Sequence, residues 1–190
     1  AEDFDLAVHD LIKKQATEHQ RVVFNGNGYS DEWVAEAERR GLPNIKSMVD
    51  AIPTLTTEKA VAMFERFGVF TKAELESRVE IKYESYAKAI NIEAKTMIDV
   101  AGKQIIPAVI AYTKSLADTV NSVTAAGAKA TVQAALLNEI SGLLEETKAA
   151  LTRLIELDAE AAQKEEGVEQ AKFFHDVVMP AMGDLRTPVD

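Results

Sequence analysis

The sequence of 190 residues contains no cysteine, only five prolines and a single tryptophan. Without thiols it can form no disulfide framework, no thiolate nucleophile and no zinc site built on sulfur ligands. This composition is typical of a reducing compartment, and we expect a cytoplasmic protein. The chain is long enough to bury a core without disulfides or metals, so one domain is the simplest prediction.

Positive charge is also scarce, because 21 Lys and Arg stand against 31 Asp and Glu, a formal net charge of -10. No nucleic-acid partner is expected, since binding to phosphates needs a basic surface and the sequence has no basic stripe. The most apolar run, IIPAVIAY at 105–112, is much shorter than the roughly 18 residues of a membrane span. We therefore expect a soluble protein with no membrane partner.

Helical periodicity runs through the sequence, and no strand pattern of convincing length occurs. We predict an all-α fold, an antiparallel bundle of long, coiled-coil-like helices behind a shorter helical N-terminal region. The expected organisation is a single helical domain over 1–190, with short helices and loops over 1–70 and the long-helix bundle over 71–190. The sequence starts AEDFD without a methionine or an apolar leader, so we expect a fragment of a longer protein.

The first predicted helix has apolar residues at helical spacing, and a short apolar run closes it. These residues are Phe4, Val8, Leu11 and Ile12, then Val22, Val23 and Phe24. In FNGNGYSDEW at 24–33 the two glycines allow a turn, and Ser30 is expected to cap a helix that carries Trp33. Gly41, after two arginines, is expected to end that helix.

The sharpest helix start is VFTKAEL, where Thr71 and Glu74 can each satisfy a backbone donor of the other. From there the apolar positions keep helical spacing for about fifty residues, which would make a helix roughly 80 Å long. One subset recurs every eleven residues and predicts a nearly straight rod. Its members are Val79, Ile90, Ala101, Tyr112 and Val123.

Pro107 is expected to kink this rod, because proline lacks a backbone donor and crowds the carbonyl of Lys103. Gly127 is expected to reverse the chain into a second long helix with a heptad seam. The seam residues are Leu136, Ile140, Leu143, Thr147, Ala150, Leu154, Leu157 and Ala161. Gly167 marks a second reversal, into a last helix that Pro180 should bend. Its apolar line is Ala171, Phe174, Val178, Ala181 and Leu185.

Packing along these seams, rather than helix propensity, is expected to hold the fold together. Burying each large aliphatic side chain contributes roughly 1.5 to 3 kcal/mol. Accordingly, Leu143→Ala is expected to lower the free energy of unfolding by about 2 to 5 kcal/mol.

The glycine-rich stretch FNGNGYS is a weak candidate for phosphate binding. It has neither the spacing nor the lysine of GxxxxGK, and it lacks the third glycine of GxGxxG. No strand and β-α-β unit surrounds it. The pattern favours a structural turn over a nucleotide site.

The three histidines, His9, His19 and His175, belong to neither HExxH nor the ExxH pairs of bundle metal sites. No serine lies in a GxSxG elbow. We therefore predict no catalytic, cofactor-binding or metal-ligating residue.

Acidic side chains beside the apolar stripes are candidates for function, but a surface role is favoured. Glu93 and Asp99, with Asn91, are expected to flank the seam and to reach Lys95, Lys103 or water. Two further groups are predicted to be solvated. One group is Glu76, Glu80 and Glu84, whose mutual repulsion is reduced by Lys72 and Lys88. The other is the run around Glu156, Asp158, Glu160, Glu165 and Glu166.

Several separate blocks, in order, resemble the region that follows the catalytic domain in type III glutamine synthetases. They are FNGNGYSDEW with EAERRGLPN, then VFTKAELESR, INIEAKTMID and QIIPAVIAYTK. The resemblance covers about residues 20–118, and beyond Ala125 it is one of helical character only. The sequence departs from the family pattern at Val79 and Gly102, where a larger aromatic and a lysine are expected.

The resemblance implies a parent enzyme, a glutamate-ammonia ligase of glutamine biosynthesis, that uses ATP and Mg or Mn in a large ring-shaped homo-oligomer. The family's catalytic and metal-binding motifs belong to the preceding domain, so no site residue is carried over. The implied partner is the catalytic domain of the same chain, and the implied role here is non-catalytic, in packing and oligomer assembly. Two alternatives stay open: an independent coiled-coil adaptor, and a regulatory module that binds a small molecule through the GNG loop.

Overall fold

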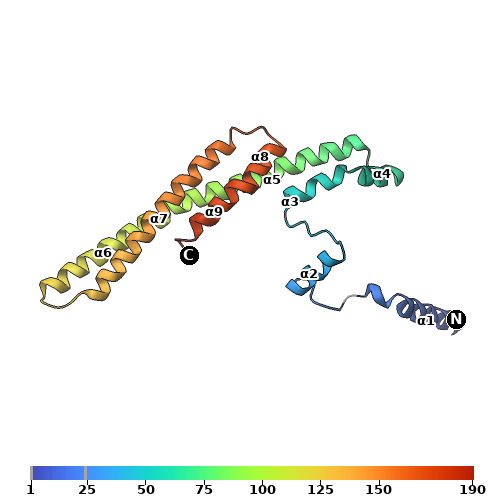
Figure 1. Cartoon of the computed structure of the whole chain (residues 1–190), viewed down its shortest axis with the longest axis horizontal. Coiled ribbons are helices and arrows are strands. Elements are labelled where there is room, and N and C mark those ends of the chain that lie inside the picture. The colour runs from blue at the N-terminus through green and yellow to red at the C-terminus, as the bar shows by residue number, and fades with distance from the viewer. Residues whose placement is uncertain (1, 24) are drawn as a thin grey trace. The chain divides into compact units, whose positions relative to one another are not determined.

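A computed structural model describes residues 2–23 and 25–190 of the chain, and within these residues every regular element is helical. This confirms the all-α prediction (Figure 1). Contacts divide the chain into two compact units, 1–45 and 46–190. The division into short helices over 1–70 and a bundle over 71–190, in one domain, stays a prediction.

The first unit contains α1 (Glu2–Glu18), the short 3-10 helix η1 (Gln20–Val22) and α2 (Asp31–Arg39). The predicted apolar spacing does form a helix in α1, but its large side chains are exposed to solvent within this unit. The exposed fractions are 71% for Phe4, 57% for Leu11 and 63% for Ile12. Phe24, which was expected to close this segment, lies outside the described residues.

Both ends of α2 follow the sequence prediction. The Ser30 hydroxyl accepts the N–H of Trp33 at 3.2 Å, as an N-cap does. Gly41 has a φ of 71°, and the N–H groups of Gly41 and Leu42 donate to the carbonyls of Glu38 and Ala37. This bonding pattern is a Schellman motif, in which glycine is favoured because the backbone is left-handed there.

In the second unit, three short elements lie against the start of the first long helix. The elements are α3 (Met48–Ala51), the 3-10 helix η2 (Ile52–Thr56) and α4 (Glu58–Arg66). Val49 in α3 and Ile52 in η2 are buried. Thr57 caps the start of α4, and Gly68, with a φ of 64°, follows its end.

The first long helix begins at the predicted capping box. The N–H of Thr71 donates to Glu74 Oε2 at 2.8 Å, and the N–H of Glu74 donates to Thr71 Oγ1 at 3.3 Å. The helix then continues without a break as α5 (Lys72–Val100), the π-helical turn η3 (Ala101–Ile105) and α6 (Ile106–Ala125).

Pro107 and Pro180 each follow a π-helical turn. η3 ends two residues before Pro107, and the second π-helical turn, η4 (Phe174–Val178), ends two residues before Pro180. A π turn inserts one residue into a helix, which moves the backbone carbonyls relative to the proline ring. The kink expected at Pro107 and the bend expected at Pro180 stay predictions.

The chain reverses at Gly127 and Gly167, whose φ values are 79° and 97°, as predicted. Between them α7 (Thr131–Ala161) runs back along α6 and α5, and the last helix, α8 (Val168–Phe173), η4 and α9 (Met179–Arg186), packs on both α5 and α7. Figure 1 shows α9 ending part of the way along the pair, so α6 and the first half of α7 continue as a two-helix hairpin.

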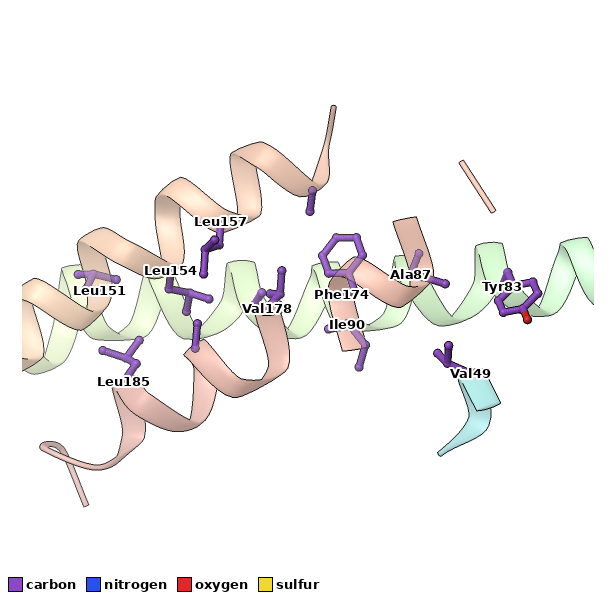
Figure 2. Packing of buried hydrophobic residues seen from close by; sticks show 14 of the residues in the cluster. Val49, Tyr83, Ala87, Ile90, Leu151, Leu154, Leu157, Phe174, Val178 and Leu185 are labelled. Atoms are coloured by element: carbon purple, nitrogen blue, oxygen red, sulfur yellow. The ribbon is translucent and has the colours of Figure 1, made fainter. Parts of the chain in front are cut away.

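The core lies where three helices meet, and Figure 2 shows Leu154, Val178 and Leu185 pointing into it from α7, η4 and α9. The apolar line predicted for the last helix is buried in full: Ala171, Phe174, Val178, Ala181 and Leu185. In α7 the buried residues of the predicted seam are Thr147, Leu154, Leu157 and Ala161, with Leu151 beside them.

The prediction of a deep core position for Leu143 is wrong, because this side chain is 39% exposed. Leu143 lies near the end of the three-helix section, beside Pro188 and Val189, which follow α9. Beyond that point no described helix covers the hairpin on its third side. A heptad position is buried only as far as the partner helices extend.

Candidate functional site

The GNG loop forms a turn that is closed by the side chain of Asn27, one of its own residues. The N–H of Tyr29 donates to Asn27 Oδ1 at 3.0 Å, and the N–H of Ser30 donates to the carbonyl of Asn27 at 3.4 Å. Two amides that a phosphate cradle would direct at an anion are therefore already bonded within the loop. This geometry favours the predicted structural turn, in which Asn27 is the organising residue.

The histidines lie in separate places. His9 Nδ1 is 3.2 Å from Asp10 Oδ1 in α1, where both side chains are exposed, and His19 precedes η1. His175 is partly exposed, with Nδ1 2.7 Å from Asp176 Oδ1. Within residues 2–23 and 25–190, no three His, Asp or Glu side chains converge as a bound metal ion requires.

Most acidic side chains of the long helix are solvated, as predicted. Asp99 pairs with Lys103, and two of the three stacked glutamates pair within the helix. Lys72 Nζ lies 3.6 Å from Glu76, and Lys88 Nζ lies 2.5 Å from Glu84. Exposed pairs of this kind contribute little to stability.

Asp158 departs from the prediction of a solvated acidic run. Its Oδ1 atom is buried and has no hydrogen-bond partner among the described residues. Burial raises the pKa of the Asp158 carboxyl, while the positive charge of Lys95 on α5 opposes that rise. The signal in the sequence is its position one turn after the buried Leu154, on the flank of the seam.

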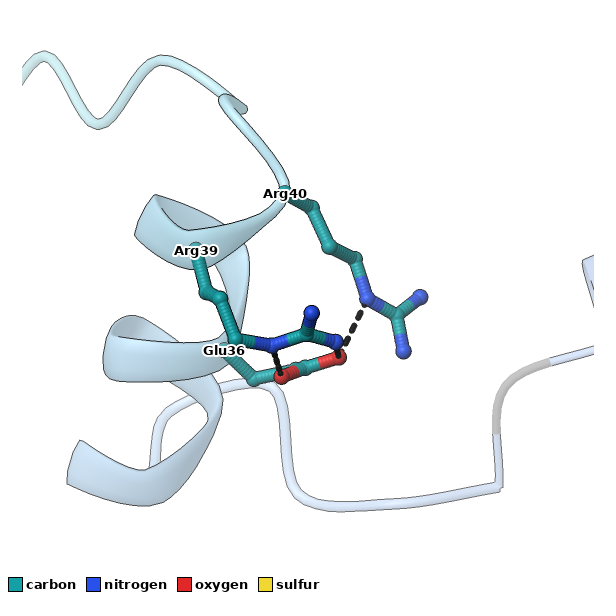
Figure 3. A network of polar contacts seen from close by, with 3 residues as sticks. All are labelled: Glu36, Arg39 and Arg40. Carbon is teal, nitrogen blue, oxygen red and sulfur yellow. Dashed lines mark hydrogen bonds and ion pairs between the residues drawn. The ribbon is translucent and has the colours of Figure 1, made fainter.

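Three charged side chains at the C-terminal end of α2 form a compact cluster, in which Arg40 is the C-cap residue (Figure 3). Arg39 Nε and Nη2 donate to the two oxygens of Glu36 at 2.6 and 2.7 Å, and Arg40 Nε donates to Oε1 at 2.5 Å. The hydrogen bonds from Arg39 and then Arg40 lower the pKa of Glu36 to about 2. The i,i+3 and i,i+4 spacing in EAERR could have predicted this cluster.

An open groove of about 830 Å³ lies between α6 and α7 on the second unit. Its apolar side chains include Ile106, Ile110 and Leu144, and its charged rim includes Lys148 and Glu156. Ile110 is 53% exposed. Exposed apolar side chains framed by charge are typical of protein-binding surfaces, so this hairpin groove is the candidate functional site.

None of the described helices combines the length and the apolar character that crossing a membrane would need.

Comparisons with known proteins agree on one family. Residues 7–124 match the family described as the glutamine synthetase C-terminal domain. A glutamine synthetase of Butyrivibrio fibrisolvens is 35% identical over 185 residues, which are 96% of this chain and 26% of that protein. The Type-3 glutamine synthetase of Dictyostelium discoideum is 40% identical over 117 residues, 62% of this chain and 16% of that protein.

A glutamine synthetase of Bacteroides fragilis is 27% identical over 98% of this chain and 26% of its own length. The chain thus spans about a quarter, or less, of these relatives. The family match ends at Thr124, next to the tip of the hairpin, so the helices after the tip are matched by the relatives rather than by the family pattern.

Proposed function

The chain belongs to the glutamine synthetase C-terminal domain family, and on that premise we propose that it is a non-catalytic packing and assembly element of a type III glutamine synthetase. The parent enzyme would join ammonia to glutamate with ATP and Mg or Mn, and that chemistry would lie in the rest of the protein. The partners would be the catalytic domain of the same chain and further copies of the enzyme, in the cytoplasm.

The observation that carries this proposal is the hairpin of α6 and α7 beyond the end of α9. Of the α6 side chains only Leu116 is buried, and Ile110 and Tyr112 are 53% and 48% exposed. A helix pair with one open seam gains stability when another surface covers it. A protruding element of this kind suits contact between parts of a large assembly.

The test removes the hairpin from the full-length enzyme while keeping the three-helix core. Tyr112 of α6 and Ile140 of α7 line a second pocket between the two helices, together with Val109 and Leu143, so a short glycine-rich turn can replace residues 113–139. We expect a smaller or less stable assembly by light scattering, with the remaining helices intact by circular dichroism. An assembly of unchanged mass and stability would refute the assembly role.

A matched control changes the hairpin tip without removing a surface. Val132 is 77% exposed, so Val132→Ser should leave the mass and stability of the assembly unchanged. The non-catalytic part of the proposal has its own test. The isolated 190-residue chain should form no glutamine from glutamate, ammonia and ATP, and genuine turnover would overturn it.

A further inference from the structure

The helix α1 of the first unit has an apolar face that its own unit leaves uncovered. Phe4, Val8 and Leu11 recur at helical spacing, and Ile12 extends the same face. All four side chains are exposed within the described part of this unit, and even the least exposed of them, Val8, is 38% exposed. A helix with an apolar stripe of this kind is stabilised mainly by packing that stripe on another surface.

The opposite side of α1 is suited to solvent. Lys13 and Thr17 lie on it with His9 and Asp10 beside them, and Leu6 is the one large apolar side chain there. The Thr17 hydroxyl donates to the carbonyl of Lys13 at 2.8 Å, and His9 Nδ1 lies 3.2 Å from Asp10 Oδ1. These polar side chains find partners on the helix itself or in water. The helix therefore has one face for solvent and one for a second surface.

The position of α1 in the chain indicates which surface covers the apolar face. The family match starts at Ala7, inside α1, so this helix spans the start of the C-terminal domain. The matching part is 26% of the Butyrivibrio fibrisolvens relative, so most of that protein lies outside it. Elements that follow one another in a chain are usually adjacent in space. A helix at the start of a C-terminal domain is thus placed to contact what precedes that domain.

We propose that the apolar face of α1 packs on the domain that precedes the C-terminal domain in the same polypeptide. This inference rests on the parent enzyme of the proposed function, and it names the surface that fixes the C-terminal domain to the rest of that enzyme. The α6–α7 hairpin then serves contacts between parts of the assembly, and α1 serves a contact within its own chain.

Covalent connection favours this occupant over two others. A short connection gives two parts of one chain an effective concentration in roughly the millimolar range, and this concentration falls as the connection lengthens. The helical bundle of 46–190 is joined to α1 only through residues 19–45, which is a longer connection. A second copy has no covalent connection at all. The preceding domain is therefore the apolar surface that α1 meets most readily.

The experiment compares two thiols on α1 in the full-length enzyme. Lys13 follows Leu11 by two residues, so it lies about 200° further round the helix, on the polar side. Both positions are exposed in α1 and the chain has no cysteine of its own here, so without a covering surface Leu11→Cys and Lys13→Cys should react equally with iodoacetamide. Peptide mass spectrometry follows each site, and division by the rate in urea removes intrinsic differences between the thiols.

We expect the thiol of Leu11→Cys to react at least roughly tenfold more slowly than that of Lys13→Cys, because a covered thiol reacts only when its contact opens. Both variants should keep the circular dichroism and the mass of the parent assembly. Equal rates at the two sites would overturn the inference.

A cross-link identifies the covering surface. A photo-reactive leucine analogue in place of Leu11 should link to a peptide outside residues 1–190. The enzyme is assembled from a mixture of chains with ordinary and heavy nitrogen, so that a link within one chain joins peptides of the same isotope only. A link that also gives mixed pairs comes from a second copy. Mixed pairs, or a link that ends within residues 46–190, would contradict the proposed occupant.

The outcomes separate this inference from the assembly function. If excising the hairpin leaves the assembly unchanged while Leu11 stays covered by its own chain, the assembly role fails and the docking of α1 stands. If excision breaks the assembly while the Leu11→Cys thiol reacts freely, the assembly role stands and the docking of α1 is wrong.

Discussion

The backbone N–H of Ile106 donates to the carbonyl of Ala101, five residues earlier, where an α-helix would bond to a residue four earlier. The same arrangement recurs where Met179 donates to Phe174. In both places a proline is the next residue. The extra residue of each π turn lets a proline lie inside a long helix that continues beyond it.

Deleting Gln104 tests the link between the π turn and Pro107. Gln104 is exposed, and its loss would convert η3 to an α turn without changing how the flanking helices face. With Pro107 present, the ring would then clash with the preceding turn, and we expect a loss of roughly 3 kcal/mol in the free energy of unfolding. In a Pro107→Ala background the same deletion should cost much less. Equal losses in chemical denaturation would contradict the explanation.

Truncation of leucines along α7 should show where the three-helix core ends. Leu154 is fully buried, so Leu154→Ala is expected to cost about 2 to 5 kcal/mol through the cavity it leaves. Leu143 is 39% exposed, and Leu143→Ala should cost at most about 1.5 kcal/mol. Urea denaturation of the two variants compares them directly. A larger loss at position 143 would mean that the core extends further along the hairpin.

Replacement of Asp158 should stabilise the protein at neutral pH. Because burial raises the folded pKa above the ordinary value of 3.8, the folded state favours the protonated carboxyl. Stability is therefore lost as pH rises through the folded pKa, and it is retained below 3.8. The asparagine of Asp158→Asn does not titrate, so the variant should gain about 0.5 kcal/mol in the free energy of unfolding at pH 7. The gain is small because solvent screens the group.

The pH dependence of the Asp158→Asn gain separates this explanation from a simple packing effect. Measured by thermal unfolding from about pH 3 to about pH 8, the gain should vanish at the acidic end, where the carboxyl is protonated in both the folded and the unfolded state. A gain that is constant with pH would show that the charge on Asp158 is not its cause.

The Glu36 carboxyl should titrate far below an ordinary glutamate. Its pKa is lowered to about 2, so its contribution to α2 is present above 4.5 and is lost as pH falls through 2. An NMR titration of the side-chain carboxyl gives the midpoint directly. Arg39→Ala should raise it more than Arg40→Ala, because Arg39 donates two hydrogen bonds and Arg40 one. The opposite order would contradict the assigned geometry.

Local signals predicted the helix ends well, because each end is decided by a few adjacent residues. Thr71 with Glu74, Ser30, and the glycines at 41, 127 and 167 act through bonds and backbone angles within one turn. The line from Ala171 to Leu185 was also predictable, since its side chains share one face of one helix.

The sequence by itself determined the helices, their ends, the reversals and the absence of a known phosphate motif, because these depend on spacing within a single chain segment. Only the tertiary structure decided which seam positions are covered. The heptad pattern of α7 is the same at Leu143 and Leu154, but α9 covers one and stops near the other. It also decided the burial of Asp158, since burial depends on neighbouring helices that lie far away in the sequence.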